Sequence, residues 1–101
     1  MAYVGFVGRT VVAGAFEWDS EKAESNVAKH GVSFEEAVTV FEDPHLLELE
    51  DVGAVGGRLN AIGFSRRGRI LFVVTFEIGE RTRIISARGA TGGERRHYQA
   101  G

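Results

Sequence analysis

Cysteine is absent from this chain of 101 residues, so the protein can form neither a disulfide nor a thiolate metal site, and it has no cysteine nucleophile. The three histidines, His30, His45 and His97, show no metal-ligand spacing, and we expect neither a metal ion nor any other cofactor. No apolar run reaches the roughly 18–20 residues that span a bilayer. The first fifteen residues also lack the basic start and the long apolar core of a signal peptide. We therefore expect a cytoplasmic protein with no membrane partner.

Lysine is scarce as well, because ten of the twelve basic residues are arginines. The net charge of −2 conceals an uneven distribution: residues 17–51 carry 11 acidic and two basic side chains, whereas residues 52–101 carry nine arginines and three glutamates. Arginine presents a planar fork of donors that fits a phosphate group, so the basic half favours a polyanionic partner. The alternative is that these arginines only solvate the open face of a small sheet.

A chain of this length suggests one domain with a modest core, and its patterns predict an α+β fold. Asp19 and Gly31 suit the two ends of a first helix. Ser33 and Glu36 form a predicted capping box for a second helix, which ends before Pro44 because the residue that precedes a proline avoids helical geometry.

The later part of the chain predicts a four-stranded antiparallel meander followed by a short C-terminal helix. The expected strands are residues 46–50, 58–65, 69–76 and 81–88. In the second of them, either the odd-numbered set from Leu59 to Gly63 or the even-numbered set faces the core. Thr91 and Glu94 make another capping box for the final helix. Residues 1–15 could form a short strand or a loose arm.

The last two strands form a hairpin that we expect at the centre of the sheet. Its first strand is the most apolar run of the chain, and a short link containing Gly79 follows. Strict alternation places Arg83, Ile85 and Ala87 on one face and Ile84, Ser86 and Arg88 on the other. Such a hairpin would be a rigid mount for guanidinium groups. This leads to the hypothesis that it binds the phosphate backbone of RNA.

Residues 16–99 resemble the BrnT toxin family. The resemblance rests on the runs Phe16–Asp19, Asn26–Phe34, Val40–Pro44 and Arg83–Arg88, followed by Ala90–Thr91, Glu94–Arg95 and Tyr98. It implies a bacterial type II toxin with a RelE/ParE-like fold and a ribonuclease activity that blocks translation. It also implies an antitoxin of the BrnA type, a ribbon-helix-helix protein that neutralises the toxin and represses the operon. Operator DNA would then be bound only through the toxin–antitoxin complex.

The resemblance also divides the chain into two parts, and the sequence departs from the family pattern at two places. Residues 16–99 are the predicted toxin domain, and residues 1–15 are an N-terminal extension of unknown role. Gly89 stands where the family usually has lysine, which removes one phosphate-binding charge. Gly92 and Gly93 replace a polar or basic pair, which weakens the final helix.

Cleavage of RNA without a metal needs a base for the 2′-hydroxyl, donors for the charged phosphorane and an acid for the leaving oxygen. RNA supplies the nucleophile. The predicted catalytic residues are Arg88 and Arg58 as cations, His30 as acid or base and Glu94 as base. Histidine changes its charge nearest to neutral pH, which favours His30. Each has a structural alternative: Arg88 could pair with an acid of the first helix, His30 could serve only the helix end, and Glu94 could serve only the capping box.

The predicted RNA-binding residues are Arg83, Arg66, Arg67 and Tyr98. Arg83 could instead form an exposed cross-strand pair, and Tyr98 could simply cover the core. Two other functions compete with a ribonuclease. One is a non-enzymatic ParE-like toxin that binds a protein target, and the other is an antitoxin-binding co-repressor module.

Overall fold

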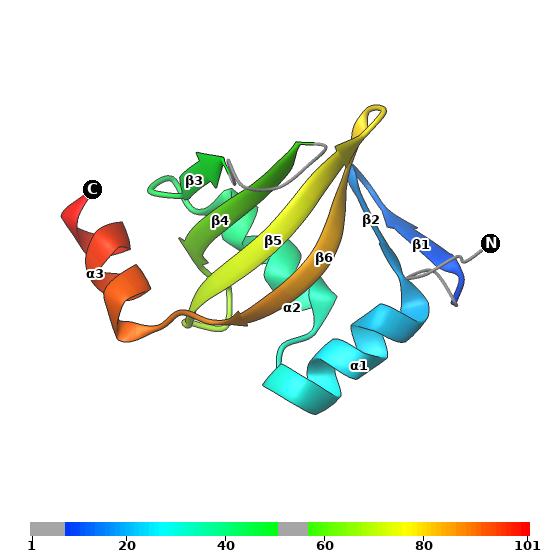
Figure 1. The fold of residues 1–101 in the computed structure, drawn as a ribbon, viewed down its shortest axis with the longest axis horizontal. Helices are drawn as coiled ribbons and strands as arrows, with labels where there is room; N and C mark the ends of the chain where they lie inside the picture. The colour runs from blue at the N-terminus through cyan, green and yellow to red at the C-terminus, as the bar shows by residue number, and fades with distance from the viewer. Residues whose placement is uncertain (1–7, 51–56) are drawn as a thin grey trace.

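A computed structural model describes residues 8–50 and 57–101 of the chain. In this part of the chain one mixed sheet of six strands has the order β1-β2-β6-β5-β4-β3 (Figure 1). The strands are β1 (Thr10–Ala13), β2 (Phe16–Asp19), β3 (Leu47–Glu50), β4 (Arg58–Phe64), β5 (Ile70–Ile78) and β6 (Arg81–Gly89). The helices are α1 (Ser20–His30), α2 (Phe34–Val38), the 3-10 turn η1 (Thr39–Glu42) and α3 (Gly92–Ala100).

The expected four-stranded meander is wrong as a description of the whole sheet. Strands β3 to β6 do pair antiparallel in chain order, but β1 and β2 extend the sheet beyond β6. Strand β2 pairs with β6 in parallel, with Phe16 opposite Thr82 and Glu17 opposite Arg83. Such a short strand carries too little alternation to be separated from a helix lead-in by sequence alone.

The helix ends follow their local sequence. The Asp19 side chain accepts from the Lys22 backbone N–H at 3.0 Å, and Gly31 ends α1 with φ +68°, as predicted. Ser33 caps α2, but the Glu36 side chain does not complete the predicted box because it turns to Arg69 and Ser65. The second helix also breaks after five residues into η1.

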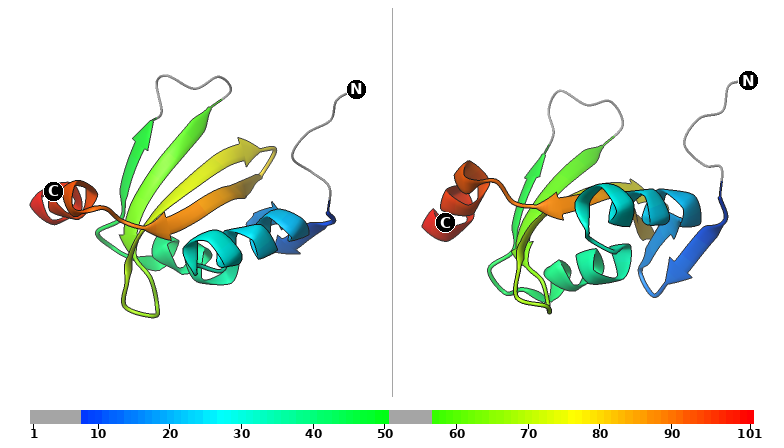
Figure 2. Two further views of the ribbon diagram at one scale, coloured as in Figure 1. Left: turned by 60° about the horizontal axis from the view of Figure 1, so that its bottom comes forward. Right: turned by 90° about the horizontal axis from the view of Figure 1, so that it is seen from below.

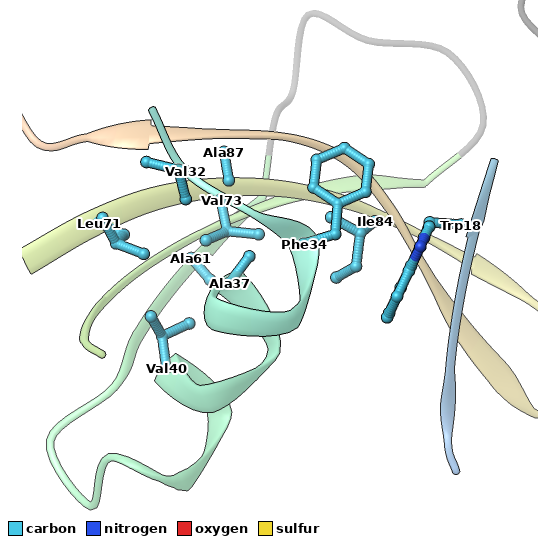
Figure 3. Packing of buried hydrophobic residues seen from close by; sticks show 10 residues of the cluster. All are labelled: Trp18, Val32, Phe34, Ala37, Val40, Ala61, Leu71, Val73, Ile84 and Ala87. Carbon is cyan, nitrogen blue, oxygen red and sulfur yellow. The ribbon is translucent and has the colours of Figure 1, made fainter. Parts of the chain in front are cut away.

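Helices α1 and α2 cover one face of the sheet, whereas α3 lies away from them and contacts β4 (Figure 2). The core fills the space between the two helices and the sheet (Figure 3). It contains Trp18, Val32, Phe34, Ala37, Val40, Ala61, Leu71, Val73, Ile84 and Ala87. In β4, Ala61 and Gly63 face the helices, so the odd-numbered alternative holds. A Cβ at Gly63 would stand 3.0–3.1 Å from Leu46 and Val40, which explains why a glycine lies there.

A β-bulge in the central hairpin overturns the predicted division of its faces. Val74 lies opposite Ser86 and Thr75 opposite Ile84, which leaves Ile85 as an extra residue in β6. An extra residue inverts the alternation beyond it. Arg83 and Arg88, opposite Phe76 and Phe72, therefore point to the same face, and not to opposite ones.

Candidate functional site

The candidate site lies on the face of the sheet that α1 and α2 leave uncovered, which we call the open face. The strand register places nine side chains of β4, β5 and β6 on it. They are Arg58, Asn60, Ile62, Phe72, Val74, Phe76, Arg83, Ser86 and Arg88. An apolar centre is thus flanked by three arginines.

Arg88 is held at the end of β6 by two contacts. Its Nη1 and Nη2 donate to the two carboxylate oxygens of Glu94 at 2.8 and 2.9 Å, and its guanidinium carbon lies 4.4 Å from the ring centroid of Phe72. Glu94 is itself positioned by the capping box with Thr91, which is present in full. The hydrogen bonds from Arg88 lower the pKa of Glu94, and the same bonds raise the pKa of Arg88. The sequence predicted both the capping box and a candidate site at Arg88, but the structure pairs Arg88 with α3 and not with an acid of α1.

Arg88 keeps one complete edge of its guanidinium available. Both hydrogens of Nη1 are used, by Glu94 and by the Gly89 carbonyl at 3.2 Å, and one hydrogen of Nη2 is used by Glu94. The N–H of Nε and the second hydrogen of Nη2 have no partner among residues 8–50 and 57–101. These two donors point the same way and match two oxygens of a phosphate group. The side chain is 36% exposed, so part of it is open to solvent.

Arg83 is buried, so it does not form the exposed cross-strand pair that was the alternative to RNA binding. It donates to Glu17, which also lies 3.8 Å from Arg81. Arg83 precedes Arg88 by five residues, a separation of about 15 Å along an extended strand. The two arginines share a face, but the structure does not bring them together.

Arg66 and Arg67 form the turn between β4 and β5 and pair toward the helix side of the sheet. Arg66 lies 2.7 Å from Glu42 of η1, and Arg67 lies 3.8 Å from Glu36 of α2. Their ion pairs therefore lie on the helix side of the sheet, and the cluster around Arg88 lies on the other face.

The uneven charge of the two halves is explained in part by ion pairs that form between them. Five arginines of the basic half contact carboxylates of the acidic half. The pairs are Arg66–Glu42, Arg67–Glu36, Arg69–Glu36, Arg81–Glu17 and Arg83–Glu17. Ion pairing thus accounts for much of the charge pattern, and only an arginine with spare donors keeps a role as an anion site.

The other predicted site residues are dispersed. His30 is exposed at the end of α1, and Arg58 is exposed at the start of β4, in the same cross-strand row as Phe76. The hydroxyl of Tyr98 donates to Asp43, and this bond raises the pKa of Tyr98 to about 12. Tyr98 therefore anchors α3 and is a poor proton donor near neutral pH.

Two residues of this region were missed by the sequence analysis. The Asn26 amide donates to the Ala87 carbonyl at 2.7 Å and accepts from the Ala87 N–H at 3.1 Å, so a side chain pairs with the edge of β6. Its signal was a polar residue within the helix that packs on the sheet. Phe72 supports Arg88, and the register of β5 against β6 was needed to identify it.

No cluster of three or more potential metal ligands occurs in residues 8–50 and 57–101. Over the same residues, no helix has both the length and the apolar character required to span a membrane.

Comparisons with known proteins agree with this architecture. The family model described as "Ribonuclease toxin, BrnT, of type II toxin-antitoxin system" matches residues 18–94. The crystal structure of the Brucella abortus ribonuclease toxin BrnT is similar to this chain, with a TM-score of 0.60 and 27% sequence identity. That match covers 73% of this chain and 92% of the other. A search of curated proteins finds no match.

Proposed function

Because the chain belongs to the BrnT family of ribonuclease toxins of type II toxin–antitoxin systems, we propose that it cleaves RNA without a metal ion and thereby inhibits translation. The observation that carries this proposal is the spare edge of Arg88. A fixed guanidinium with two parallel donors suits the charge that develops on a phosphorane.

In the proposed reaction the RNA 2′-hydroxyl attacks the adjacent phosphorus, and the 5′-oxygen of the next nucleotide leaves. The spare edge of Arg88 binds the non-bridging oxygens as their negative charge grows. Glu94 was predicted as the base, but its lowered pKa makes it a weak proton acceptor. We therefore assign Glu94 the task of orienting Arg88.

His30 remains the proposed proton carrier, which takes the proton of the attacking 2′-hydroxyl and gives it to the leaving 5′-oxygen. His30 shares a surface hollow with Ser86. Ser86 lies on the open face, two positions before Arg88 in β6. Arg58 and Arg83 are proposed to contribute positive charge along the open face. Arg66 and Arg67 are left as predicted RNA contacts with no support from their position.

The family also implies an antitoxin partner. We propose a BrnA-like ribbon-helix-helix protein that neutralises the toxin by covering the basic open face and that carries the complex to operator DNA. Complementary charge predicts a tighter complex at low salt. A RelE/ParE-like classification of the fold and the division of the chain at residues 15 and 16 also stay predictions.

The proposed function is tested with purified protein and RNA in the presence of a chelator. We expect cleavage to persist without divalent metal and to fall by about 100-fold or more in Arg88→Ala, because a transition-state donor is lost. Arg9→Ala is the matched control, since it removes an exposed arginine that is not among the predicted site residues. The circular dichroism of both variants must match that of the wild type.

Two results would contradict the proposal in different ways. Growth inhibition without RNA cleavage would favour a toxin that binds a protein target. Antitoxin binding without toxicity would favour the co-repressor module. Gly89 keeps the co-repressor module open, because it stands where the family usually has a lysine, and a Cβ there would meet nothing within 4 Å.

A further inference from the structure

The only two lysines of the chain, Lys22 and Lys29, line one hollow between α1 and β6. The hollow has a volume of about 220 Å³, and its lining also includes Ser25, Asn26, His30, Ile85 and Ser86. Lys22, Ser25, Asn26 and Lys29 follow the spacing i, i+3, i+4 and i+7, so they form one stripe along the helix. Of these four side chains Asn26 is buried, Lys22 is half-buried and the other two are exposed, so a polar and cationic stripe borders the sheet.

This stripe is held against β6 by its central residue. Asn26 is buried and exchanges two hydrogen bonds with Ala87, so α1 occupies the edge of β6 beyond the end of β2 (Figure 1). The lysines on either side of Asn26 are therefore carried on a fixed element. The cationic lining is set by the fold.

The cations of the hollow differ from most arginines in having no carboxylate partner. Within the described residues, no carboxylate oxygen lies within 4 Å of Lys22, Lys29 or His30. Asp19, which precedes Lys22 by three residues, directs its oxygens to the backbone N–H groups of Gly8 and Lys22. Positive charge that is gathered in a concave site and left uncompensated attracts an anion.

The hollow reaches β6 close to Arg88. Ser86 lines it, and the register places Ser86 on the same face as Arg88. The two residues are two positions apart, about 7 Å along the strand. A chain of phosphate groups bound at the spare edge of Arg88 can therefore pass over Ser86 and reach Lys22 and Lys29 around the edge of β6.

We propose that this hollow is a second phosphate subsite, in which Lys22 and Lys29 hold a phosphodiester group of the RNA strand that is bound at Arg88. The proposal rests on the proposed ribonuclease function and extends it from one phosphate group to a strand path. Ser25 and Ser86 also line the hollow and carry hydroxyl groups. The path runs from the open face over the edge of β6 toward α1.

The test uses the full chain and a short single-stranded RNA with 2′-O-methyl groups, which lacks the nucleophile and cannot be cleaved. Fluorescence anisotropy gives its affinity at several salt concentrations for the wild type and for Lys22→Gln/Lys29→Gln. Loss of one phosphate contact should reduce the slope of log K against log salt by about 0.7 and the affinity at low salt by about tenfold. Arg9→Gln/Arg81→Gln is the matched control, since it removes the same charge from exposed positions outside the hollow.

The outcomes separate this inference from the proposed function. If the lysine variant binds with the slope and affinity of the arginine control, the subsite is wrong even though cleavage by the wild type continues. If the wild type cleaves no RNA but binds the oligonucleotide in a lysine-dependent way, the subsite stands and the ribonuclease proposal fails. A wild type that does not bind the oligonucleotide overturns the subsite as well. A change in the circular dichroism of the lysine variant is checked by Lys22→Arg/Lys29→Arg, which must restore the wild-type slope.

Discussion

Two arginine–carboxylate clamps of the same chemistry lie at opposite sides of the sheet. Arg69, just before β5, clamps Glu36 of α2, and Arg88 of β6 clamps Glu94 of α3. Glu36 has a side chain that is 3% exposed, whereas that of Glu94 is 23% exposed. The first clamp is closed to solvent on its acidic side, and the second is open.

The difference lies in which donors remain. Arg69 uses Nε and Nη2 on Glu36 and the second hydrogen of Nη2 on the Gly31 carbonyl, so its two remaining hydrogens belong to a single nitrogen. Arg88 uses the other edge and keeps Nε and Nη2 together. Of these two arginines, only Arg88 retains a complete fork. An ion pair therefore does not by itself identify a structural arginine, because the geometry of the pair decides whether a phosphate group can still bind.

The largest expected effect, and the strongest test of the difference between the two ion pairs, is that of Arg88→Lys. Lysine keeps the charge but is a point donor without a planar fork. We expect cleavage to fall about 100-fold, with a change in the unfolding free energy below about 1 kcal/mol, because the pair is partly solvated. Single-turnover cleavage and urea unfolding measure the two quantities. Full activity of this variant would show that charge suffices and that the spare edge has no special role.

The closed clamp is tested by Glu36→Ala. This change leaves Arg69 and Ser65 without their common acceptor, and we expect the unfolding free energy to fall by about 3 kcal/mol. Cleavage per folded molecule should stay unchanged. Glu35→Ala, an exposed neighbour, is the control in the same urea titration. An equal effect of both substitutions would remove the distinction between a closed clamp and an open one.

The smallest expected effect concerns the second anchor of α3. Tyr98→Phe removes the bond to Asp43 and should lower the unfolding free energy by about 1 kcal/mol at neutral pH. Burial raises the pKa of Asp43, but the hydrogen bonds from Tyr98 and from two backbone N–H groups outweigh it, so its pKa lies below 3.8. The contribution of the Tyr98–Asp43 bond to the unfolding free energy is present above pH 3.8, and it is lost as the pH falls through the pKa of Asp43 in the folded protein.

At alkaline pH the contribution of Tyr98 to the unfolding free energy depends on pH with the opposite sign. The pKa of Tyr98 is raised from 10.0 to about 12, so its contribution is complete below pH 10.0 and is lost as the pH rises through about 12. The stability difference between wild type and Tyr98→Phe should thus be largest between about pH 4 and 10. Urea titrations across this range measure it, and a difference that is independent of pH would exclude the Asp43 bond as its source.

The sequence predictions were correct where they depended on contacts between residues close in the sequence, and they failed where the pairing of distant strands decided the outcome. Asp19 and Thr91 cap helices through contacts three residues away, and both caps form as predicted. The prediction of the faces of β6 failed at one residue, Ile85, because a single bulge inverts every position beyond it. Nothing in the local sequence marks that residue, since all of its neighbours suit a regular strand.

The candidate site divides in the same way. Sequence alone selected Arg88 and Glu94 as functional candidates, and the structure brings them into contact. The predicted companions Arg66 and Arg67 turn to carboxylates on the helix side, and Arg83 is buried with Glu17. Charge counts could not show this, because they do not tell which cations are already neutralised inside the fold.

By itself, the sequence was sufficient for the family, the helix caps at Asp19 and Thr91 and the later strands, since these depend on motifs and on contacts between near neighbours. Only the tertiary structure decided which cations remain available for an anion. The Arg83–Glu17 pair spans 66 positions, and the Asn26–Ala87 pairing that fixes α1 beside β6 spans 61. Such contacts form only when distant segments are packed together, so donor geometry and uncompensated charge are properties of the folded chain.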